Sequence, residues 1–454
     1  MTRLEEIKNL IVYAEEKLGL DECDVLYKSN RLLEIMESGL EGAELEDAIY
    51  GELSLLPSEI DRRFSEICKK EGGKAATDWL YGYCVANMYV KKAVLDKNPR
   101  FDTSNGLTIT INKAKPEFRD PKKAVAGNSV DGGFAKCVIC RENEGYGARN
   151  KRNLRTVSLT LGSHPWFWQY SPYGYFHEHG IAVNCEHIPM HVDRQTIVNL
   201  LDFVDKFPHY FIGCNAPLPR IGGSVLAHDH YQGGGEILPL HRAKIRTKIR
   251  DKKYPYVTVG ILDWPGTVIR IKSDRRNEIE DIADRLRKAW VEYSNPKLGI
   301  IAEDENGIYN AISPTVIKKM SGYEMNIILR SNITSERYPD GVFHSHPEYH
   351  AIKKESIGLI EAQGLFILPG RLEEELAEVE KLIAANKPLT DEYAQFKLVY
   401  DETKALFESG KFSDIHSAMQ EELGSICYRI LENTAVFKEE KDLLEFLKSA
   451  GFEI

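Results

Sequence analysis

The spacing of apolar residues separates helical ends from a strand-rich middle of the chain. Near the start, Leu4, Ile7, Leu10 and Ile11 recur at the period of an amphipathic helix. The same spacing continues to about residue 97 and returns after Leu372. We therefore predict helical additions at both the N-terminal and the C-terminal end.

The middle of the chain alternates apolar and polar residues over short stretches, which is typical of strands. Longer amphipathic stretches between them predict helices. The predicted strands are 107–111, 157–161, 180–183, 257–262, 267–271 and 326–329, the predicted helices are 195–204 and 277–293, and 113–133 is a predicted loop rich in Gly, Pro and Lys. This mixture indicates an α+β fold, in which helices pack against antiparallel sheets.

A faint internal repeat indicates two copies of one fold. Asn215 follows an apolar stretch and precedes a His-x-His pair by one loop, and Asn332 stands in the same way before a second pair. Each copy thus consists of a strand, an Asn, a loop and a His-x-His pair. We divide the chain into an N-terminal helical region (1–100), a first half-domain (101–240) and a second half-domain that includes the helical tail (241–454).

Composition narrows the class of protein. The 454 residues are 43% hydrophobic and 28% charged, as in an ordinary folded protein, and the net charge of −10 argues against a general nucleic-acid binder. No apolar run approaches the roughly 18 residues of a membrane helix, and residues 1–10 lack the apolar core of a signal peptide. We therefore expect a cytosolic protein with no membrane partner. Its 8 cysteines are then reduced thiols or metal ligands rather than disulfides.

The sharpest local signal is the sequence GGSVLAHDHYQGGG at 222–235. In a strand, side chains alternate between faces, so His228, His230 and Gln232 would share one face, and Asp229 and Tyr231 the other. An imidazole can attack phosphorus, and an amide N–H can stabilise charged oxygens. The pattern therefore predicts covalent chemistry at a phosphate. The alternative is an ordinary pair of histidines on a strand.

A CxxC motif, Cys137 to Cys140, is a candidate metal site. Two thiolates at this spacing can share a tetrahedral zinc ion with two further ligands, for which the sequence offers His187 and His228. A redox CxxC is the rival, but the sequence lacks the thioredoxin-like βαβ pattern that would accompany one. Two buried cysteines without a ligand are the remaining alternative.

A second histidine-rich stretch, 343–355, holds three His and two Lys. It would suit a cationic rim for a sugar phosphate or a second metal site, and the alternative is a solvated polar loop. The chain has no Walker loop and no Gly-x-Gly-x-x-Gly fingerprint in a strand–helix setting. Phosphate binding must therefore use scattered side chains and strand-edge amides.

Aromatic residues cluster at 164–176. They could wall a pocket for a base or a sugar, but such runs more often belong to a core or a subunit interface, which is the interpretation that we favour. The neighbouring His177 and His179, and His191 further along, show no specific pattern, and we interpret them as structural.

These motifs carry a resemblance to a known family. With the stretches 1–7, 137–140 and 344–369, the motif at 228–232 resembles the galactose-1-phosphate uridylyltransferases, and specifically their second class, within the histidine-triad superfamily. Triad hydrolases have a third His where this chain has Gln232. The likeness covers most of the chain. It implies two histidine-triad-like half-domains, with antiparallel sheets and helices.

The resemblance also implies an activity. It is uridylyl exchange between UDP-glucose and galactose 1-phosphate, which gives glucose 1-phosphate and UDP-galactose in the Leloir route of galactose use. The family's nucleophile maps onto His230, which would carry the uridylyl group in a ping-pong reaction, and its Gln onto Gln232, which would bind a phosphoryl oxygen. Attack requires a neutral imidazole, so we expect the other ring nitrogen of His230 to donate to a backbone carbonyl.

The family's zinc site maps onto Cys137, Cys140, His187 and His228. Such a zinc would be structural, because the protein fills all four positions, and it would fix His228 beside the nucleophile. The family's first class has Pro where this chain has Asp229, and an Asn that this chain lacks. In place of those contacts we nominate three residues for the phosphate or the nucleotide: Asn215, Arg220 and Ser224.

In the second half, the resemblance implies His344 and His346 as ligands of a second metal, although the sequence shows no match for the remaining carboxylate ligand. It also implies hexose-phosphate contacts just after them. The positions that match are Lys353, Lys354, Glu361 and Gln363. The likeness further implies a homodimer.

Two other functions stay open from the sequence. One is another enzyme of the superfamily, either a dinucleoside-polyphosphate phosphorylase or a nucleotidyl hydrolase, and Gln232 argues against the hydrolase. The other is a nucleotide-binding protein without catalysis, against which the intact His230 and Gln232 speak.

Overall fold

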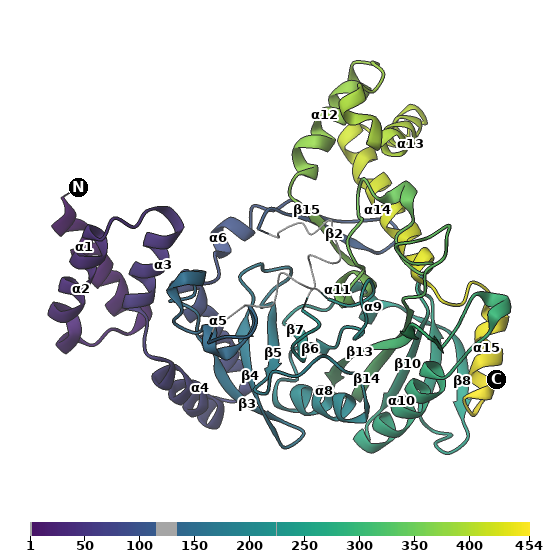
Figure 1. Cartoon of the computed structure of the whole chain (residues 1–454), viewed down its shortest axis with the longest axis horizontal. Coiled ribbons are helices and arrows are strands. Elements are labelled where there is room, and N and C mark those ends of the chain that lie inside the picture. The colour runs from purple at the N-terminus through teal and green to yellow at the C-terminus, as the bar shows by residue number, and fades with distance from the viewer. Residues whose placement is uncertain (1, 115–133, 224) are drawn as a thin grey trace.

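The computed structural model describes residues 2–114, 134–223 and 225–454 (Figure 1). Most of the predicted loop 113–133 therefore lies outside the described residues. Within them, helices form the N-terminal and C-terminal parts of the chain, and one large sheet is built mainly from the middle. The predicted α+β class is therefore confirmed. No helix in the described ranges is both long enough and apolar enough to span a membrane.

The N-terminal region is helical, as the apolar spacing predicts. Its first helix is capped by Thr2, whose side chain accepts a hydrogen bond from the backbone N–H of Glu5 while the Glu5 carboxylate accepts one from the backbone N–H of Thr2. The helices are α1 (Arg3–Tyr13), η1 (Ala14–Leu18), η2 (Glu22–Asp24), α2 (Val25–Glu37), α3 (Gly42–Leu53), α4 (Pro57–Glu71), α5 (Gly73–Ala86) and α6 (Lys92–Leu95). Leu80 and Tyr83 of α5 join the core that lies against the large sheet.

The large sheet has 11 strands, and all of its neighbouring pairs are antiparallel. Its order is β16 (Phe452–Glu453), β8 (Ile245–Asp251), β9 (Thr258–Leu262), β10 (Val268–Ser273), β14 (Gly322–Ser331), β13 (Asn310–Lys319), β6 (Phe211–Gly213), β7 (His230–Gly234), β5 (Gly180–Asn184), β4 (His164–Tyr170) and β3 (Val157–Leu161). Every strand predicted from alternation in these regions is present, and all agree within two residues except the one predicted at 326–329, which begins four residues earlier, at Gly322.

The strand order confirms the duplicated fold. In the first half the order is β6-β7-β5-β4-β3, with α8 (Arg194–Lys206) in sequence between β5 and β6. In the second half it is β13-β14-β10-β9-β8, with α10 (Arg276–Val291) between β10 and β13. The halves meet at β6 and β13, where Gly213 pairs with Thr315. One continuous sheet thus joins both copies.

The repeat that suggested this duplication, however, compared elements that are not equivalent. The first His-x-His pair leads into β7, whereas His344 follows β14, which is the counterpart of β7. Asn215 follows β6, but Asn332 follows β14, so the two asparagines occupy different positions in the fold. The repeated spacing from Asn to His-x-His in the sequence carries no information on strand order.

Helices and aromatic side chains pack against the large sheet. On one face, α8 and α10 pack over the strands, and Tyr231 of β7 stacks on Trp166 with ring centroids 4.6 Å apart. Asn199 of α8 donates to the Tyr231 hydroxyl at 3.0 Å. Trp166 and Trp168 are buried in this core, so the aromatic cluster of β4 is confirmed as a packing element.

A second core ties the chain's tail to its middle. Strand β2 (Thr108–Asn112) pairs in parallel with β15 (Leu365–Pro369) and antiparallel with β1 (Arg100–Asp102) in a separate 3-stranded sheet. These strands pack against the first helices of the C-terminal tail, which rise above the large sheet in Figure 1, whereas the last helix of the tail packs in the core of the large sheet. The tail consists of α12 (Leu372–Ala384), η7 (Asp391–Phe396), α13 (Lys397–Glu408), α14 (Ile415–Thr434) and α15 (Glu440–Ser449). The division into half-domains at 240 stays a prediction.

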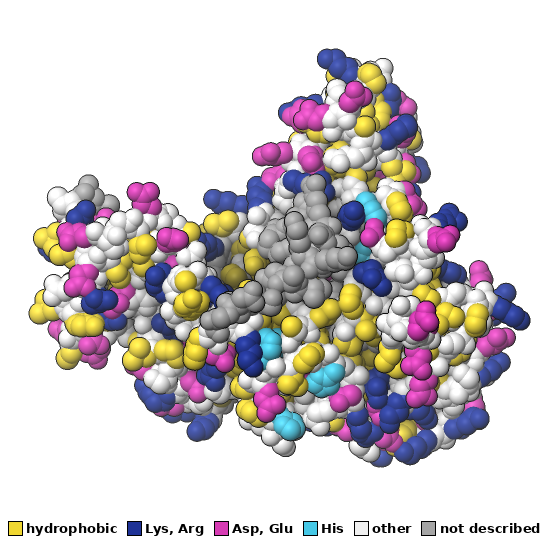
Figure 2. All heavy atoms as spheres, viewed as in Figure 1, with side chains coloured by type: hydrophobic (Ala, Val, Ile, Leu, Met, Phe, Trp, Pro, Cys, Tyr) yellow, Lys and Arg dark blue, Asp and Glu magenta, His cyan; other side chains and the backbone are white. Residues whose placement is uncertain are grey.

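Short elements complete the described fold: η3 (Arg141–Asn143), η4 (Gly147–Arg149), α9 (Pro239–Arg242), η5 (Pro296–Leu298), β11 (Glu303–Asp304), β12 (Gly307–Ile308), η6 (Pro347–Tyr349) and α11 (Leu359–Ala362). On the face in Figure 2, acidic and basic side chains are interspersed over the N-terminal helices and the tail. The excess of acidic residues is therefore spread along the chain rather than gathered in one block.

The glycines of β7 allow its neighbours to approach closely, which gives a stability prediction. A Cβ added at Gly233 would lie 2.3 Å from the carbonyl oxygen of Phe211 in the paired strand. We expect Gly233→Ala to lower the free energy of unfolding by about 3 kcal/mol, because the backbone would have to shift. Gly82→Ala on α5 is the control, since nothing lies within 4 Å there, and it should stabilise by about 0.7 kcal/mol. If urea unfolding gave the same free-energy change for Gly233→Ala and Gly82→Ala, the close approach of Phe211 to Gly233 would be contradicted.

Candidate functional site

His230 opens β7 with one ring nitrogen committed to the backbone. Its Nδ1 lies 2.8 Å from the carbonyl oxygen of His228. A carbonyl only accepts, so Nδ1 carries the hydrogen and Nε2 keeps its lone pair. Burial lowers the pKa of His230 to about 4, so the ring is neutral at pH 7. This is the backbone acceptor that the sequence analysis expected.

Gln232 follows on the same face of β7 and contacts His179, for which the sequence predicted only a structural role. Its Oε1 lies 3.3 Å from Nε2 of His179, whose ring is buried against Tyr175 and Phe176. Burial lowers the pKa of His179 to about 4. Its Nδ1 has no partner, and a buried N–H without a partner is the rarer arrangement. We therefore assign the hydrogen to Nε2, which donates to Gln232 and leaves the amide N–H groups of Gln232 as donors.

His179 was missed for a physical reason. His179 stands one residue before β5. It is brought to Gln232 by the pairing of β5 with β7, in which Gly180 lies opposite Gly233. The sole signal in the sequence is its place beside a predicted strand, which does not say which strand lies opposite.

His228 lies outside the strand that the sequence predicts for it. The strand begins at His230, and His228 sits in a bend just before it, so the rule of alternating faces does not apply to it. Its Nε2 lies 2.8 Å from the carbonyl oxygen of Asn184, which makes Nε2 the donor and leaves the lone pair on Nδ1. That lone pair faces the two cysteines of the CxxC motif.

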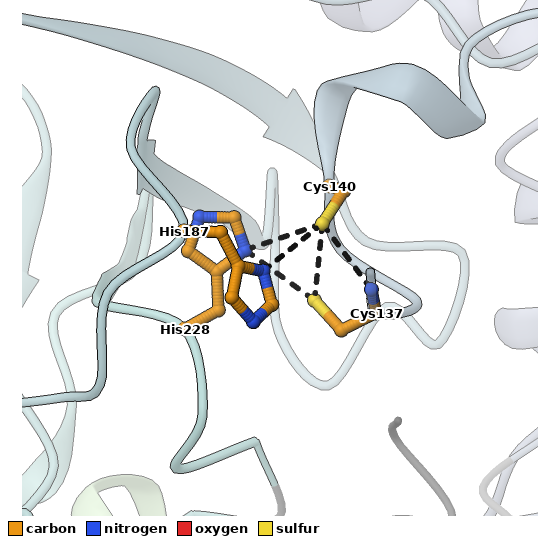
Figure 3. A group of neighbouring side chains, drawn as sticks. All are labelled: Cys137, Cys140, His187 and His228. Carbon is orange, nitrogen blue, oxygen red and sulfur yellow. Dashed lines mark hydrogen bonds between the residues drawn. The ribbon is translucent and has the colours of Figure 1, made fainter. Parts of the chain in front are cut away.

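Cys137, Cys140, His187 and His228 form one compact cluster (Figure 3). Their candidate ligand atoms all lie within 4.8 Å of one another, and the four side chains point inward from three separate segments. The contacts are 3.5 Å between the two sulfurs, 3.2 Å from Cys140 Sγ to His187 Nδ1, and 3.3 Å from Cys137 Sγ to His228 Nδ1.

These distances fit a tetrahedral metal site. Ligand atoms about 2.0–2.3 Å from a zinc ion lie roughly 3.3–3.8 Å apart at tetrahedral angles. The hydrogen bond between the thiols lowers the pKa of Cys140 and raises that of Cys137. Asn143 donates to the backbone carbonyls of both cysteines, at 2.8 and 2.9 Å, which holds the loop in place. All four ligands predicted from the sequence come together here.

The other nucleotide candidates from the first half are placed differently. Asn215 is buried just after β6, and its Oδ1 accepts from the backbone N–H of Leu359 at 2.8 Å, so it links the two halves. Arg220 has a positive φ of 69° and donates to the carbonyl oxygen of Asn332 at 2.7 Å. Ser224 lies outside the described residues.

The four hexose-phosphate candidates do not form one exposed rim. Lys353 is buried in ion pairs with Glu361 at 2.9 Å and with Glu355 at 3.1 Å, and only Lys354 is exposed. Gln363 is buried and accepts from the Thr315 hydroxyl at 3.0 Å. Their roles as sugar contacts stay predictions.

One ring nitrogen of His344 and one of His346 are hydrogen-bonded to the backbone. Nδ1 of His344 lies 3.2 Å from the carbonyl oxygen of Ser345, and Nε2 of His346 lies 3.0 Å from that of Val342. His346 also stacks on Tyr338 with ring centroids 4.0 Å apart. Among the described residues, neither histidine belongs to a group of three or more potential ligands. A second metal here stays a prediction.

Comparisons with known proteins show to which family the chain belongs. Residues 40–189 match the family model of the N-terminal domain of galactose-1-phosphate uridyl transferase, and residues 202–398 match that of its C-terminal domain. The chain is 55% identical to the galactose-1-phosphate uridylyltransferase of Bifidobacterium longum over 414 residues, which cover 91% of this chain and 80% of that protein. It is 37% identical to the protein of the same name from Ligilactobacillus salivarius, over 96% of this chain and 90% of the relative.

A solved structure, that of the yeast Ap4A phosphorylase Apa2, is similar at 10% sequence identity and a TM-score of 0.31, over 73% of this chain and 92% of that one. At that TM-score the likeness carries no argument. The family models and the two relatives do, because the matched ranges span more than half of the chain and the relatives align along nine-tenths of it. The chain belongs to the galactose-1-phosphate uridylyltransferase family.

Proposed function

We propose that this protein exchanges the uridylyl group between UDP-glucose and galactose 1-phosphate through an adduct on His230. Nε2 of His230 attacks the α-phosphorus of UDP-glucose, so an N–P bond forms while the P–O bond to the β-phosphate breaks. Glucose 1-phosphate leaves with the electron pair of that bond. A phosphate oxygen of galactose 1-phosphate then attacks the same phosphorus, which breaks the N–P bond and releases UDP-galactose.

One observation carries the proposal: the hydrogen bond from His230 Nδ1 to the carbonyl oxygen of His228. It fixes the tautomer in which Nε2 can attack, and it holds the Nδ1 hydrogen through both half-reactions. Gln232, positioned by His179, supplies amide N–H groups for a phosphoryl oxygen. The named activity of the relatives supports the same substrates.

The metal in this proposal is zinc, held by Cys137, Cys140, His187 and His228. When bound, it would supply a structural cross-link rather than a reacting centre, because the four side chains fill its tetrahedral positions. Its effect on the reaction would come through the backbone of His228, whose carbonyl oxygen orients His230. The cytosolic location and the homodimer expected from the sequence stay predictions.

The proposal is tested by isolating the adduct. The protein is incubated with UDP-glucose labelled in the uridine, without an acceptor, then digested and analysed by mass spectrometry. We expect a uridylyl group on the peptide that contains His230, which galactose 1-phosphate discharges. A protein that turns over without forming this adduct would point to direct transfer, and discharge by inorganic phosphate instead would favour the phosphorylase alternative.

Replacing His179 should impair transfer without harming the fold. His179→Phe removes the donor to Gln232, so we expect kcat to fall about 100-fold while the KM for UDP-glucose changes little, since misplacement of one polar group affects mainly the transition state. His179→Gln, which can still donate from its amide, is the conservative control and should recover most of the rate. A purely packing role would make the two variants equally defective, so steady-state kinetics on both decides.

A further inference from the structure

Arg330 is a buried cation whose donors are mostly unused. It lies on β14 opposite Ala311, and its residue is only 1% exposed. Nη2 donates to the carbonyl oxygen of Ile357 at 2.7 Å, whereas Nε and Nη1 are buried and have no partner among residues 2–114, 134–223 and 225–454. Among the described residues it forms no ion pair, and Glu361, the carboxylate whose charge acts on it, is already paired with Lys353 at 2.9 Å. Burying a charge in this way is costly unless something else completes its shell.

Arg270 shows how this protein treats a buried arginine that only supports the fold. It lies on β10 in the same sheet, and each of its three nitrogens is bonded at 2.7 Å. Nε donates to Asn326 Oδ1, Nη1 to the carbonyl oxygen of Ala243, and Nη2 to that of Leu240. Arg330 therefore differs from Arg270, whose three guanidinium nitrogens all donate to an acceptor.

Two further donors are buried without a partner in the described part of the chain, and one of them lies at the segment that Arg330 contacts. Asn215 accepts from the N–H of Leu359, two residues beyond the Arg330 contact, and its Nδ2 is buried without a partner. The Ser345 hydroxyl is likewise buried and unpartnered. Burial lowers the pKa of the preceding His344 to about 4, and the charge of Arg330 adds to that effect.

A guanidinium, an amide N–H group and a hydroxyl without acceptors together fit an oxyanion. We propose that Arg330, with Asn215 and Ser345, binds the phosphate of the hexose 1-phosphate, which is the β-phosphate of the nucleotide sugar before transfer. Guanidinium groups bind phosphate strongly because charge and several N–H donors act together. Asn215 belongs to the first half of the chain, and Arg330 and Ser345 belong to the second. The assignment rests on the proposed function.

The ping-pong scheme gives this site two uses. In the first half-reaction its charge would stabilise glucose 1-phosphate as it leaves, and in the second it would bind galactose 1-phosphate as it enters. Loss of Arg330 should therefore slow both the formation and the discharge of the adduct. A residue that recognises only the sugar or the uracil would affect the two steps unequally.

The test compares Arg330→Met with Arg270→Met and Arg270→Lys. Inorganic phosphate, used as the probe, should raise the thermal unfolding midpoint of the unsubstituted protein and of the folded Arg270 variant, but not of Arg330→Met. The KM for galactose 1-phosphate should rise about 100-fold in Arg330→Met, as for a lost hydrogen bond to a charged group. Without phosphate, Arg330→Met should be as stable as the unsubstituted protein or more so, because an uncompensated charge is gone, whereas Arg270→Met should be less stable.

The outcomes separate this site from the proposed function. If Arg330→Met keeps the phosphate-induced shift and the KM, the anion site is wrong while adduct formation can still hold. If the unsubstituted protein forms no adduct but its phosphate shift depends on Arg330, the function is wrong and the anion site stands. Should Arg330→Met not fold, Arg330→Lys carries the test, and an unchanged KM and phosphate shift in that variant would overturn the assignment.

Discussion

Replacing His230 by alanine is expected to lower kcat for uridylyl transfer by about 10⁵-fold or more. The side chain supplies the Nε2 lone pair that would form the N–P bond, and its geometry is fixed by the 2.8 Å hydrogen bond to the His228 carbonyl oxygen. Without the imidazole, the two sugar phosphates would have to exchange the group directly, and both are anions. Steady-state assays with UDP-glucose and galactose 1-phosphate measure the loss.

Two controls make that loss specific. His164→Ala, at an exposed position that opens β4, should keep full turnover. The His230→Ala protein should still bind UDP-glucose in a calorimetric titration, with the metal content and unfolding midpoint of the unsubstituted protein. Substantial residual turnover in His230→Ala would remove His230 as the nucleophile, and loss of both binding and metal would mean that the substitution had damaged the fold instead.

The second large effect concerns the metal cluster. Cys140→Ser is expected to reduce bound zinc from about one ion per chain to almost none and to lower the free energy of unfolding by more than about 4 kcal/mol. Cys140 contacts both Cys137 and His187, so its loss opens the centre of the cluster. Transfer activity should fall as well, because the backbone of His228 also holds the nucleophile.

Elemental analysis and thermal unfolding measure these changes. Cys23→Ser is the matched control, since Cys23 is an exposed free thiol outside the cluster, and it should change neither metal content nor stability. Equal zinc in the Cys140→Ser and unsubstituted proteins would rule out the four-residue site. If the unsubstituted protein contains no metal and Cys140→Ser behaves like Cys23→Ser, the cysteines are an ordinary buried thiol pair.

Local pattern was enough for most elements of the fold. The alternation at 157–161 gives β3 with the same bounds, and the amphipathic stretch at 277–293 gives α10 within two residues. Both patterns work because burial of one face imposes a period of two on a strand and of 3.6 on a helix. The aromatic run of β4 was likewise assigned to the core, where Trp166 and Trp168 lie.

Local spacing also found the chemistry that lies close together in the chain. Cys137 and Cys140 are three residues apart, and His230 and Gln232 share one strand face, so short-range geometry already brings each pair together. Joining these pairs to His187 required the resemblance to a family, because nothing in spacing alone says which distant histidine reaches the cysteines.

What the sequence by itself determined, then, was the type of most elements, the α+β class and the residues most suited to react. Only the tertiary structure decided that His179 contacts Gln232, that β2 pairs with β15, and that Arg330 is buried with unused donors. It also showed that His344 follows the counterpart of β7 rather than leading into it. The physical reason is that periodicity records which face of an element is buried, whereas contacts between distant residues depend on strand order and register, which residue spacing alone does not encode.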